Sequence, residues 1–277
     1  MSTFQAVIYS VINGISQFIP ISASAHQILV PDLMDWPQFN GIFWGGLTLG
    51  SALALLIYFR HDWASMISCL LQVIIFRKKP MTLDERIPLF LMITTLPIGV
   101  TSYYFDEQIS QFAWTPLNVS VILAGVGVPL WFFDSFSRKT KNIFDLKWID
   151  ASIIGIFQAT AICPGWDPLT SVLLATAFLN YKREPALKYA YFSLTPILFA
   201  KSFLYLKGFN IHLSSPMNNI SWLSFLIGFL ISLLIGLLSI GGFMKHVQQK
   251  GLSRYIIYRW TLAFSVYIVH WIRNSTE

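Results

Sequence analysis

A stretch near the start of the chain, GISQFIPISASAH, carries polar groups that are suited to chemistry although its neighbours are apolar. It contains His26 and the hydroxyls of Ser22 and Ser24, and it has no charged residue. An ionisable group in apolar sequence is costly unless it is satisfied or used, so His26 is a candidate for proton transfer. The alternatives are a histidine satisfied by a carbonyl and serines that only satisfy a broken backbone.

A second polar interruption, FQATAICPGWDPLTS, lies near the middle of the chain. Asp167 could supply a carboxylate there, and Thr170 and Ser171 could supply hydroxyls. The segments GISQFIPIS (14–22) and GIFQATAICPG (155–165) both begin Gly-Ile-x-Gln and carry a proline further on. This short similarity, separated by about half the chain, indicates an internal repeat.

The composition indicates which class of protein positions these residues. The chain has 277 residues, of which 55% are hydrophobic and only 12% are charged. A soluble domain carries about 25% charged residues, so the sequence predicts a polytopic membrane protein. The net charge of +6 suits loops that face an anionic leaflet. The sequence has no basic stripe interleaved with aromatic residues, so it does not predict nucleic-acid binding. Cys69 and Cys163 form neither a disulfide framework nor a metal-ligand spacing.

Six apolar stretches are long enough to span a bilayer as helices. They lie at residues 41–59, 87–105, 117–133, 189–206, 220–244 and 255–272. Two further apolar segments, 4–30 and 151–180, are interrupted by polar residues. A third, 64–76, is too short to span and is expected to lie at the interface or to extend a neighbouring helix.

The distribution of lysine and arginine predicts the topology. Fifteen of these 19 residues lie in four loops, at 60–86, 134–150, 181–188 and 245–254. The positive-inside rule places those loops in the cytoplasm. The loops alternate correctly only if each interrupted segment enters and leaves on one side, 4–30 from outside and 151–180 from the cytoplasm. We therefore expect an all-α polytopic membrane protein with six transmembrane helices and two oppositely oriented re-entrant helical hairpins, an inverted-topology repeat.

The expected fold is a single integral membrane domain over residues 1–277, with repeat halves at about 1–133 and 151–272. Pro20 and Pro164 are expected to end helical runs inside the hairpins. The hydroxyls of Ser22, Ser24 and Thr170 are expected to cap the exposed ends. Half-helix N-termini that meet in mid-membrane favour an anion, such as the phosphate head of a lipid.

Taken together, these segments resemble the bacterial undecaprenyl-diphosphate phosphatases of the bacitracin-resistance type. The likeness covers nearly the whole chain: GISQFIPISASAH followed by QILV, LGSALALLIYFR (49–60), FQATAICPG (157–165) and YIIYRWTLAFSVYIV (255–269). It implies the same six-span fold and cleavage of undecaprenyl diphosphate to the monophosphate carrier of cell-envelope synthesis. It also implies a multi-pass protein of the bacterial cytoplasmic (inner) membrane, with a site that opens to the outer face.

The first family motif resembles E-G-x-x-E-F-x-P-[VI]-S-S-[ST]-[GA]-H, and this chain departs from it. Asn13 and Gln17 occupy the two glutamate positions, and Ala23 occupies the second serine position, whereas Ser22 and His26 are retained. Two carboxylates four residues apart share one helix face and can hold a cation or take a proton from water, whereas amides cannot take a proton. The family suggests Mg²⁺ or Ca²⁺ as a cofactor, but these carboxylate ligands are missing here.

The second motif resembles P-G-x-S-R-S-G, and here it reads PGWDPLT. Pro168 stands at the arginine position and Asp167 at the first serine position. Loss of a well-placed arginine costs about 10³–10⁵ in the rate of phosphoryl transfer. Arg259 could substitute for it, or it could pair with a carbonyl or with Asp167. Lys201 is expected to snorkel to the interface.

The resemblance assigns candidate roles to these positions. The catalytic candidates are His26, Ser22 and Ser24, and the substituted positions are Asn13, Gln17, Ala23 and Pro168. The substrate-binding candidates are Gly165, Trp166, Asp167, Thr170, Ser171 and Arg259. No residue is assigned to a metal.

Three functions follow as hypotheses. The chain is a lipid-diphosphate phosphatase with a rearranged site, or a non-catalytic binder or translocator of polyprenyl phosphate or another anionic lipid, or a membrane scaffold. Its expected partners are a polyprenyl phosphate or diphosphate lipid, the membrane and a second copy in a homodimer. Because substitutions occur at both motifs, binding without hydrolysis is slightly favoured.

Overall fold

The computed structural model describes residues 2–37, 41–77, 80, 82–112, 114–211 and 222–276. These residues confirm the all-α prediction. The first half contains α1 (Thr3–Ser16), α2 (Ala23–Leu33), α3 (Gly41–Tyr58), α4 (Arg60–Ile75), α5 (Leu83–Gln111) and α6 (Pro116–Phe136). The second half contains α7 (Trp148–Ala159), α8 (Pro168–Phe178), α9 (Arg183–Ile211), α10 (Trp222–Gln249) and α11 (Ser253–Thr276), and two short 3₁₀ turns, η1 (Ile143–Asp145) and η2 (Thr160–Ile162).

Four helices in the described ranges are long and apolar enough to cross a membrane. They are α3, α6, the first part of α5 (Leu83–Phe105) and most of α10 (Phe225–Gln249). These four coincide with four of the six predicted spans. The predicted spans 189–206 and 255–272 lie within α9 and α11, which have 29 and 24 residues but a more polar composition.

Two parts of the sequence-based topology fall on residues that the structure does not describe. Lys78 and Lys79, two of the lysines counted in the loop at 60–86, lie outside the described residues. The first two residues of the predicted span 220–244 also lie outside them.

Both predicted interruptions are present. α1 ends at Ser16 and α2 begins at Ala23, and α7 ends at Ala159 whereas α8 begins at Pro168. The two apolar segments therefore form pairs of short helices instead of continuous spans. The two helices within each pair contact each other.

The N-terminal caps of α2 and α8, the second helix of each pair, differ in charge. Ser22 caps α2 as predicted, and its hydroxyl accepts a hydrogen bond from the Ala25 amide at 3.3 Å. Thr170 does not cap α8. Asp167 does so instead, with its carboxylate 2.9 Å from the Thr170 amide, and Pro168 follows at the first helical position. Thr170 cannot be the cap because it lies inside the first turn, as a donor to Asp167. α2 thus begins with a neutral cap and α8 with a carboxylate.

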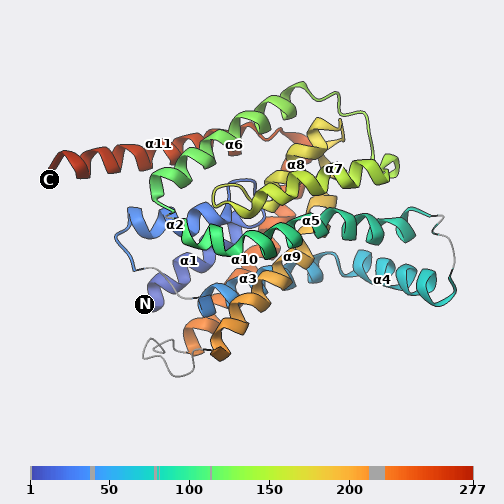
Figure 1. The fold of residues 1–277 in the computed structure, drawn as a ribbon, viewed down its shortest axis with the longest axis horizontal. Coiled ribbons are helices and arrows are strands. Elements are labelled where there is room, and N and C mark those ends of the chain that lie inside the picture. Colours follow the sequence, from blue (N-terminus) through green and yellow to red (C-terminus); the bar gives the residue numbers. More distant parts are fainter. Residues whose placement is uncertain are drawn as a thin grey trace.

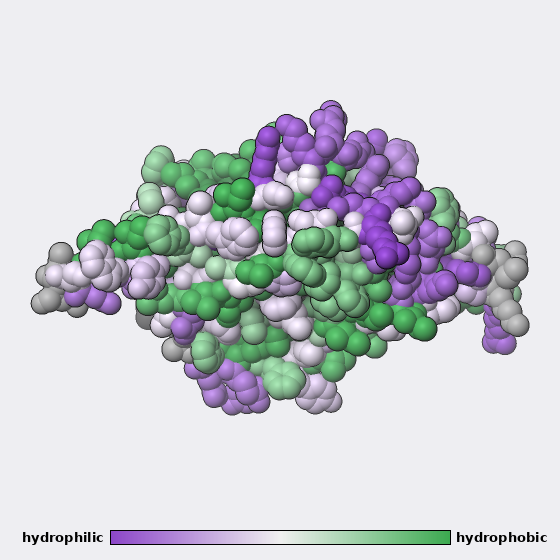
Figure 2. Space-filling view, turned by 90° about the horizontal axis from the view of Figure 1, so that it is seen from above, coloured by the Kyte–Doolittle hydropathy of each residue, from purple (hydrophilic) through white to green (hydrophobic). Residues whose placement is uncertain are grey.

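Long helices that are far apart in the chain pack against each other. α3 lies against α9 and α10, and α6 lies beside α11 (Figure 1). α1 packs on α10, and α7 packs on α5. The largest core cluster contains residues of both halves, from Phe18 to Ile256. Figure 2 shows hydrophobic residues over much of one face, with the largest group of hydrophilic residues at the upper right and a smaller group at the lower edge.

The short apolar segment 64–76 forms most of α4, a separate helix that starts directly after α3. It packs on α5 and exposes Ile67, Leu71 and Ile74. Apolar side chains on a short exposed helix are typical of a segment that lies at a membrane interface.

The closest approach of α3 and α10 occurs at Gly50. A Cβ atom there would clash with the Phe229 carbonyl oxygen and would lie 3.2 Å from the Leu233 nitrogen. Both contacts are with backbone, which cannot rotate away. Small residues commonly allow membrane helices to approach this closely.

We predict that Gly50→Leu separates α3 from α10 and lowers the free energy of unfolding by about 1–3 kcal/mol or more. Thermal unfolding in detergent measures the change. Gly99→Leu is the matched control, because no atom lies within 4 Å of a Cβ atom built at Gly99. Equal melting temperatures for the two variants would contradict this account of the helix contact.

Candidate functional site

His26 is buried at the start of α2, and both of its ring nitrogens have partners. Nδ1 lies 2.7 Å from the carbonyl oxygen of Ser22, and Nε2 lies 2.7 Å from the hydroxyl of Tyr258. The two rings are parallel, with centroids 5.7 Å apart. Because a carbonyl can only accept, Nδ1 carries the proton and neutral Nε2 accepts from Tyr258. His26 is therefore a satisfied histidine in this conformation, and proton transfer through Nε2 requires the Tyr258 hydroxyl to move.

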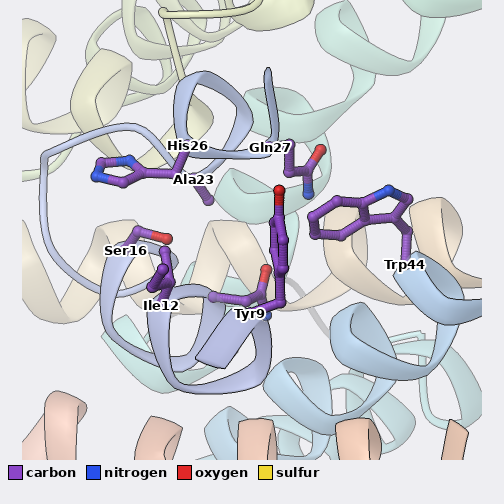
Figure 3. A pocket seen from close by; sticks show the side chains of 8 residues that line it. Tyr9, Ile12, Ser16, Ala23, His26, Gln27 and Trp44 are labelled. Carbon is purple, nitrogen blue, oxygen red and sulfur yellow. The ribbon is translucent and has the colours of Figure 1, made fainter. Parts of the chain in front are cut away.

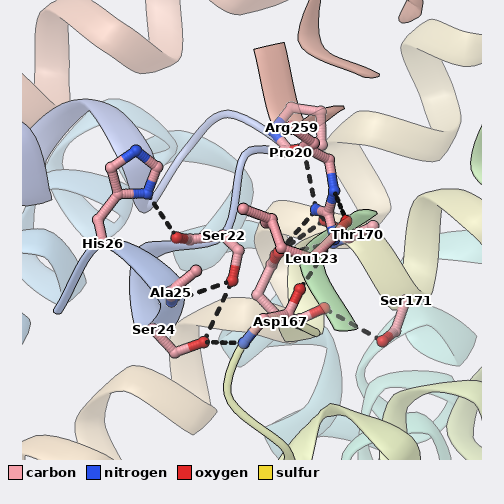
Figure 4. A network of polar contacts seen from close by, with 11 residues as sticks. Pro20, Ser22, Ser24, Ala25, His26, Leu123, Asp167, Thr170, Ser171 and Arg259 are labelled. Carbon is pink, nitrogen blue, oxygen red and sulfur yellow. Dashed lines mark hydrogen bonds and ion pairs between the residues drawn. The ribbon is translucent and has the colours of Figure 1, made fainter. Parts of the chain in front are cut away.

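The two helix breaks meet at Ser24. Its hydroxyl accepts a hydrogen bond from the Gly165 amide at 3.3 Å and lies 3.2 Å from the Ser22 hydroxyl (Figure 4). Gly165 has a φ of +95°, and a Cβ atom there would lie 3.0 Å from the Val119 carbonyl oxygen. The close approach and the backbone conformation both require glycine at this position.

Arg259 of α11 joins the two breaks to α6. Its side chain is fully buried. It donates hydrogen bonds to the carbonyl oxygens of Leu123 at 3.0 Å, Pro20 at 3.3 Å and Gly165 at 2.8 Å. It also donates to the Thr170 hydroxyl at 3.4 Å (Figure 4). The guanidinium thus satisfies backbone that the broken helices leave open. Its predicted role in binding substrate is not needed to explain this position.

Asp167 balances the charge of Arg259. A carboxylate oxygen lies 3.7 Å from the guanidinium, and the same oxygen accepts a hydrogen bond from the Thr170 hydroxyl at 2.7 Å. The Ser171 hydroxyl donates to the Asp167 carbonyl oxygen at 3.1 Å. Asp167, Thr170 and Ser171 are all buried. The candidate residues of the second motif therefore form an internal network, and their predicted contact with substrate stays a prediction.

Trp166 lies next to this network and is partly buried. Among the described residues its indole nitrogen has no hydrogen-bond partner. A buried indole N–H that lacks a partner is available to a ligand or to water.

A narrow crevice with about 160 Å³ of empty space lies beside the first break (Figure 3). Its lining residues come from α1, α2 and α3. They are Tyr9, Ile12, Asn13, Ser16, Ala23, His26, Gln27 and Trp44. None of these carries a permanent charge. The crevice brings together two substituted positions and the retained histidine, whereas Gln17 and Pro168 do not line it.

Asn13, at the first glutamate position, is fixed by two serines. Its amide nitrogen donates to the hydroxyls of Ser51 at 3.1 Å and Ser232 at 2.9 Å. Its amide oxygen and the hydroxyl of Ser16 are buried and have no hydrogen-bond partner among the described residues. The crevice therefore offers hydrogen-bond acceptors where carboxylates were expected.

The residues at this site do not fit a divalent cation. Mg²⁺ and Ca²⁺ prefer several oxygen ligands that include carboxylates. Asn13 and Gln17 are amides, and Asp167 is taken up by the α8 cap and by Arg259. Within the described ranges, no group of three His, Cys, Asp or Glu residues could hold a metal ion.

Comparison with known proteins shows the family. Residues 6–265 match the model of a family described as "Bacitracin resistance protein BacA". The chain belongs to the BacA family. Proteins named undecaprenyl-diphosphatase are similar to it over nearly their full length. The protein from Caldicellulosiruptor bescii is 30% identical, with 99% of each chain covered. That from Idiomarina loihiensis is 30% identical over 97% of this chain and 99% of its own, and that from Moorella thermoacetica is 28% identical over 99% and 100%.

The sequence analysis missed three residues that form hydrogen bonds with candidate site residues of this BacA-family protein. Tyr258 holds His26, and Ser51 and Ser232 hold Asn13. All three come from helices far away in the chain. The only signal for Tyr258 was its place beside Arg259 in the segment YIIYRW, and no spacing indicated the two serines.

We predict that Arg259→Met lowers the free energy of unfolding by about 3–5 kcal/mol, because it leaves Asp167 as an unpaired buried charge. Thermal unfolding in detergent measures the loss. Lys201→Met is the control, since among the described residues the Lys201 amine has no ion pair or hydrogen bond and lies 5.9 Å from the Tyr205 ring. A stable Arg259→Met protein that has lost only lipid affinity would show that Arg259 serves the ligand instead.

Proposed function

We propose that this protein binds a polyprenyl phosphate or diphosphate, the lipid carrier of cell-envelope synthesis, and does not hydrolyse it as an effective phosphatase does. The observation that carries the proposal is the charge inventory of the site. The crevice is uncharged, and the Asp167 carboxylate at the second break is paired with the guanidinium of Arg259 from α11. Family membership supports the lipid class, because the relatives are named undecaprenyl-diphosphatases.

The proposed topology is six spans and two re-entrant hairpins, α1–α2 and α7–α8, in an inverted repeat. The packing supports it, because α1 packs on α10 and α7 packs on α5. In an inverted repeat, α1 would correspond to α7, and α5 would correspond to α10. The lysine- and arginine-rich loops would face the cytoplasm, so the α1–α2 hairpin would open to the outer face of the inner membrane.

The N-terminus of α2 is the proposed position for the lipid phosphate. Free N–H groups at a helix start favour an anion. α2 begins with the neutral Ser22, whereas the corresponding end of α8 is already neutralised by Asp167. The lipid tail would then remain among the helices, as suits an apolar chain.

Hydrolysis is expected to be slow because its acid–base groups are missing. A positioned general base contributes about 10²–10⁴ in rate, and a well-placed arginine contributes about 10³–10⁵. Asn13 cannot take a proton, and Pro168 cannot bind a phosphate. Phosphatase activity is the second candidate function, favoured by one observation: His26 lines the crevice.

We predict that the purified protein carries polyprenyl phosphate or diphosphate in native mass spectrometry. With undecaprenyl diphosphate and Mg²⁺ or Ca²⁺, it is expected to release phosphate no faster than a His26→Ala variant. Absence of any prenyl lipid, together with no uptake when the lipid is added, would refute binding. Phosphate release well above the His26→Ala control would instead favour the phosphatase.

We also predict that Asn13→Glu, Gln17→Glu and Pro168→Arg together raise phosphate release by about 10² or more. The Ser51 hydroxyl, which now accepts from Asn13, can donate to a carboxylate at the same position, whereas the Ser232 hydroxyl donates to the Leu47 carbonyl oxygen. The same triple variant with His26→Ala is the control. A folded triple variant that stays inactive would show that the lost activity has another cause.

A further inference from the structure

A second and larger crevice lies away from the hairpin site, where α6, α8, α9 and the turn between α10 and α11 meet. It has about 290 Å³ of empty space and shares no lining residue with the first crevice. Its apolar lining comes from Leu173, Ala177, Ala186, Val247 and Leu252, and its polar lining from Asp134, Lys139, Thr176, Tyr181 and Arg183. A cavity with an apolar floor and a few polar groups has the character of a ligand site.

Asp134 is the buried anchor of this crevice. Its carboxylate accepts two hydrogen bonds from Arg183, at 2.7 and 2.8 Å, and a third from the Leu252 amide at 3.2 Å. The side chain is only 4% exposed. These bonds link the end of α6 to the start of α9 and to the residue before α11. The negative charge of Asp134 is thereby fully used.

Two cations face this single carboxylate. The Lys139 amine donates to the backbone carbonyl oxygen of Asp134 at 2.5 Å, which leaves two of its three N–H groups for another acceptor. Arg183 uses Nε and Nη2 on the carboxylate, and in the described part of the chain its Nη1 has no hydrogen-bond partner. Both side chains are only partly exposed.

The lowered pKa of the Lys139 amine agrees with a surplus of positive charge at the crevice. Burial and the nearby Arg183 lower the pKa of the Lys139 amine, and the opposite effect of Asp134 is smaller. A lysine that is short of negative partners gains from an added anion. The first residue of the long helix α9 is Arg183, so the positive end of that helix also lies at the crevice.

The hydroxyls of Tyr181 and Thr176 are not available as donors to such an anion, because both already donate to other groups. The Tyr181 hydroxyl donates to Asp150 at 2.7 Å. The Thr176 hydroxyl donates to the Val172 carbonyl oxygen at 2.7 Å. The donors left at the crevice are therefore those of Lys139 and Arg183.

We propose that this crevice binds a phosphate oxyanion, specifically the headgroup of an anionic phospholipid, through Lys139 and the free Nη1 of Arg183. Phosphate suits these donors because it offers several acceptor oxygens to both cations. Leu173 and Val247, which line the crevice, offer apolar surface to the first carbons of a lipid chain. The site is separate from the hairpin crevice and does not depend on the function proposed for it.

Native mass spectrometry of the delipidated full-length protein in detergent tests this site. The probes are dihexanoyl phosphatidic acid, inorganic phosphate and, as the neutral lipid, dihexanoyl glycerol. Wild type is expected to bind phosphatidic acid at one saturable site and to bind dihexanoyl glycerol at least ten times more weakly. Lys139→Gln is expected to weaken phosphatidic acid binding about tenfold or more, whereas Lys139→Arg keeps it.

Two control variants separate this site from general charge effects and from the hairpin. Lys182→Gln removes an exposed charge beside Arg183 that does not line the crevice. Ser24→Ala alters the hairpin site. Both are expected to bind phosphatidic acid as wild type does. Arg183 is left unchanged, because its removal would leave the buried Asp134 carboxylate without a charged partner.

Each outcome decides the proposal. Preference for phosphatidic acid over inorganic phosphate, with loss in Lys139→Gln, supports the lipid headgroup. Equal binding of inorganic phosphate, also lost in Lys139→Gln, supports the oxyanion site but assigns it to free phosphate. Failure to bind either probe, or binding that Lys139→Gln leaves unchanged, overturns the site.

Discussion

A helix that breaks inside a membrane leaves backbone groups without partners, and in this protein the buried guanidinium of Arg259 supplies them. One side chain from α11 donates to carbonyl oxygens of both breaks, at Pro20 and Gly165, and to α6 at Leu123. An unpaired carbonyl in hydrocarbon costs several kcal/mol. Arg259 is itself tolerable there only because Asp167 lies beside it. The meeting of the two breaks therefore depends on this ion pair and its hydrogen bonds, together with the hydrogen bond from the Gly165 amide to Ser24.

This arrangement limits the chemistry that the site can perform. Asp167 is the carboxylate at the breaks, and it is occupied by the α8 cap and by Arg259. The retained His26 is satisfied by Ser22 and Tyr258. In this member of the BacA family, the charged groups at the breaks thus hold the protein together. Binding of an anionic lipid at the start of α2, which has the neutral cap Ser22, requires no acid–base group, and it is the function that this arrangement supports best.

The sequence predicted features that depend on neighbouring residues. The two interruptions followed from prolines and polar residues in apolar segments, and the Ser22 cap followed from the local motif. The helical class and the substitutions at the glutamate positions were equally evident. Contacts between distant helices were not. Nothing local indicated that Tyr258 would meet His26 or that Ser51 and Ser232 would hold Asn13, because these pairs depend on how α1, α3, α10 and α11 pack. Thr170 was taken as a cap because it has a hydroxyl, but Asp167 three residues earlier is the stronger acceptor.

The dependence of lipid binding on divalent cations tests the central claim most directly. If uncharged groups and a helix N-terminus hold the lipid phosphate, the dissociation constant for undecaprenyl diphosphate is expected to be the same, within about threefold, in Mg²⁺, in Ca²⁺ and in EDTA. Affinity that falls by two orders of magnitude or more in EDTA would contradict the account, because it would reveal a metal site that the amides at positions 13 and 17 are not expected to form.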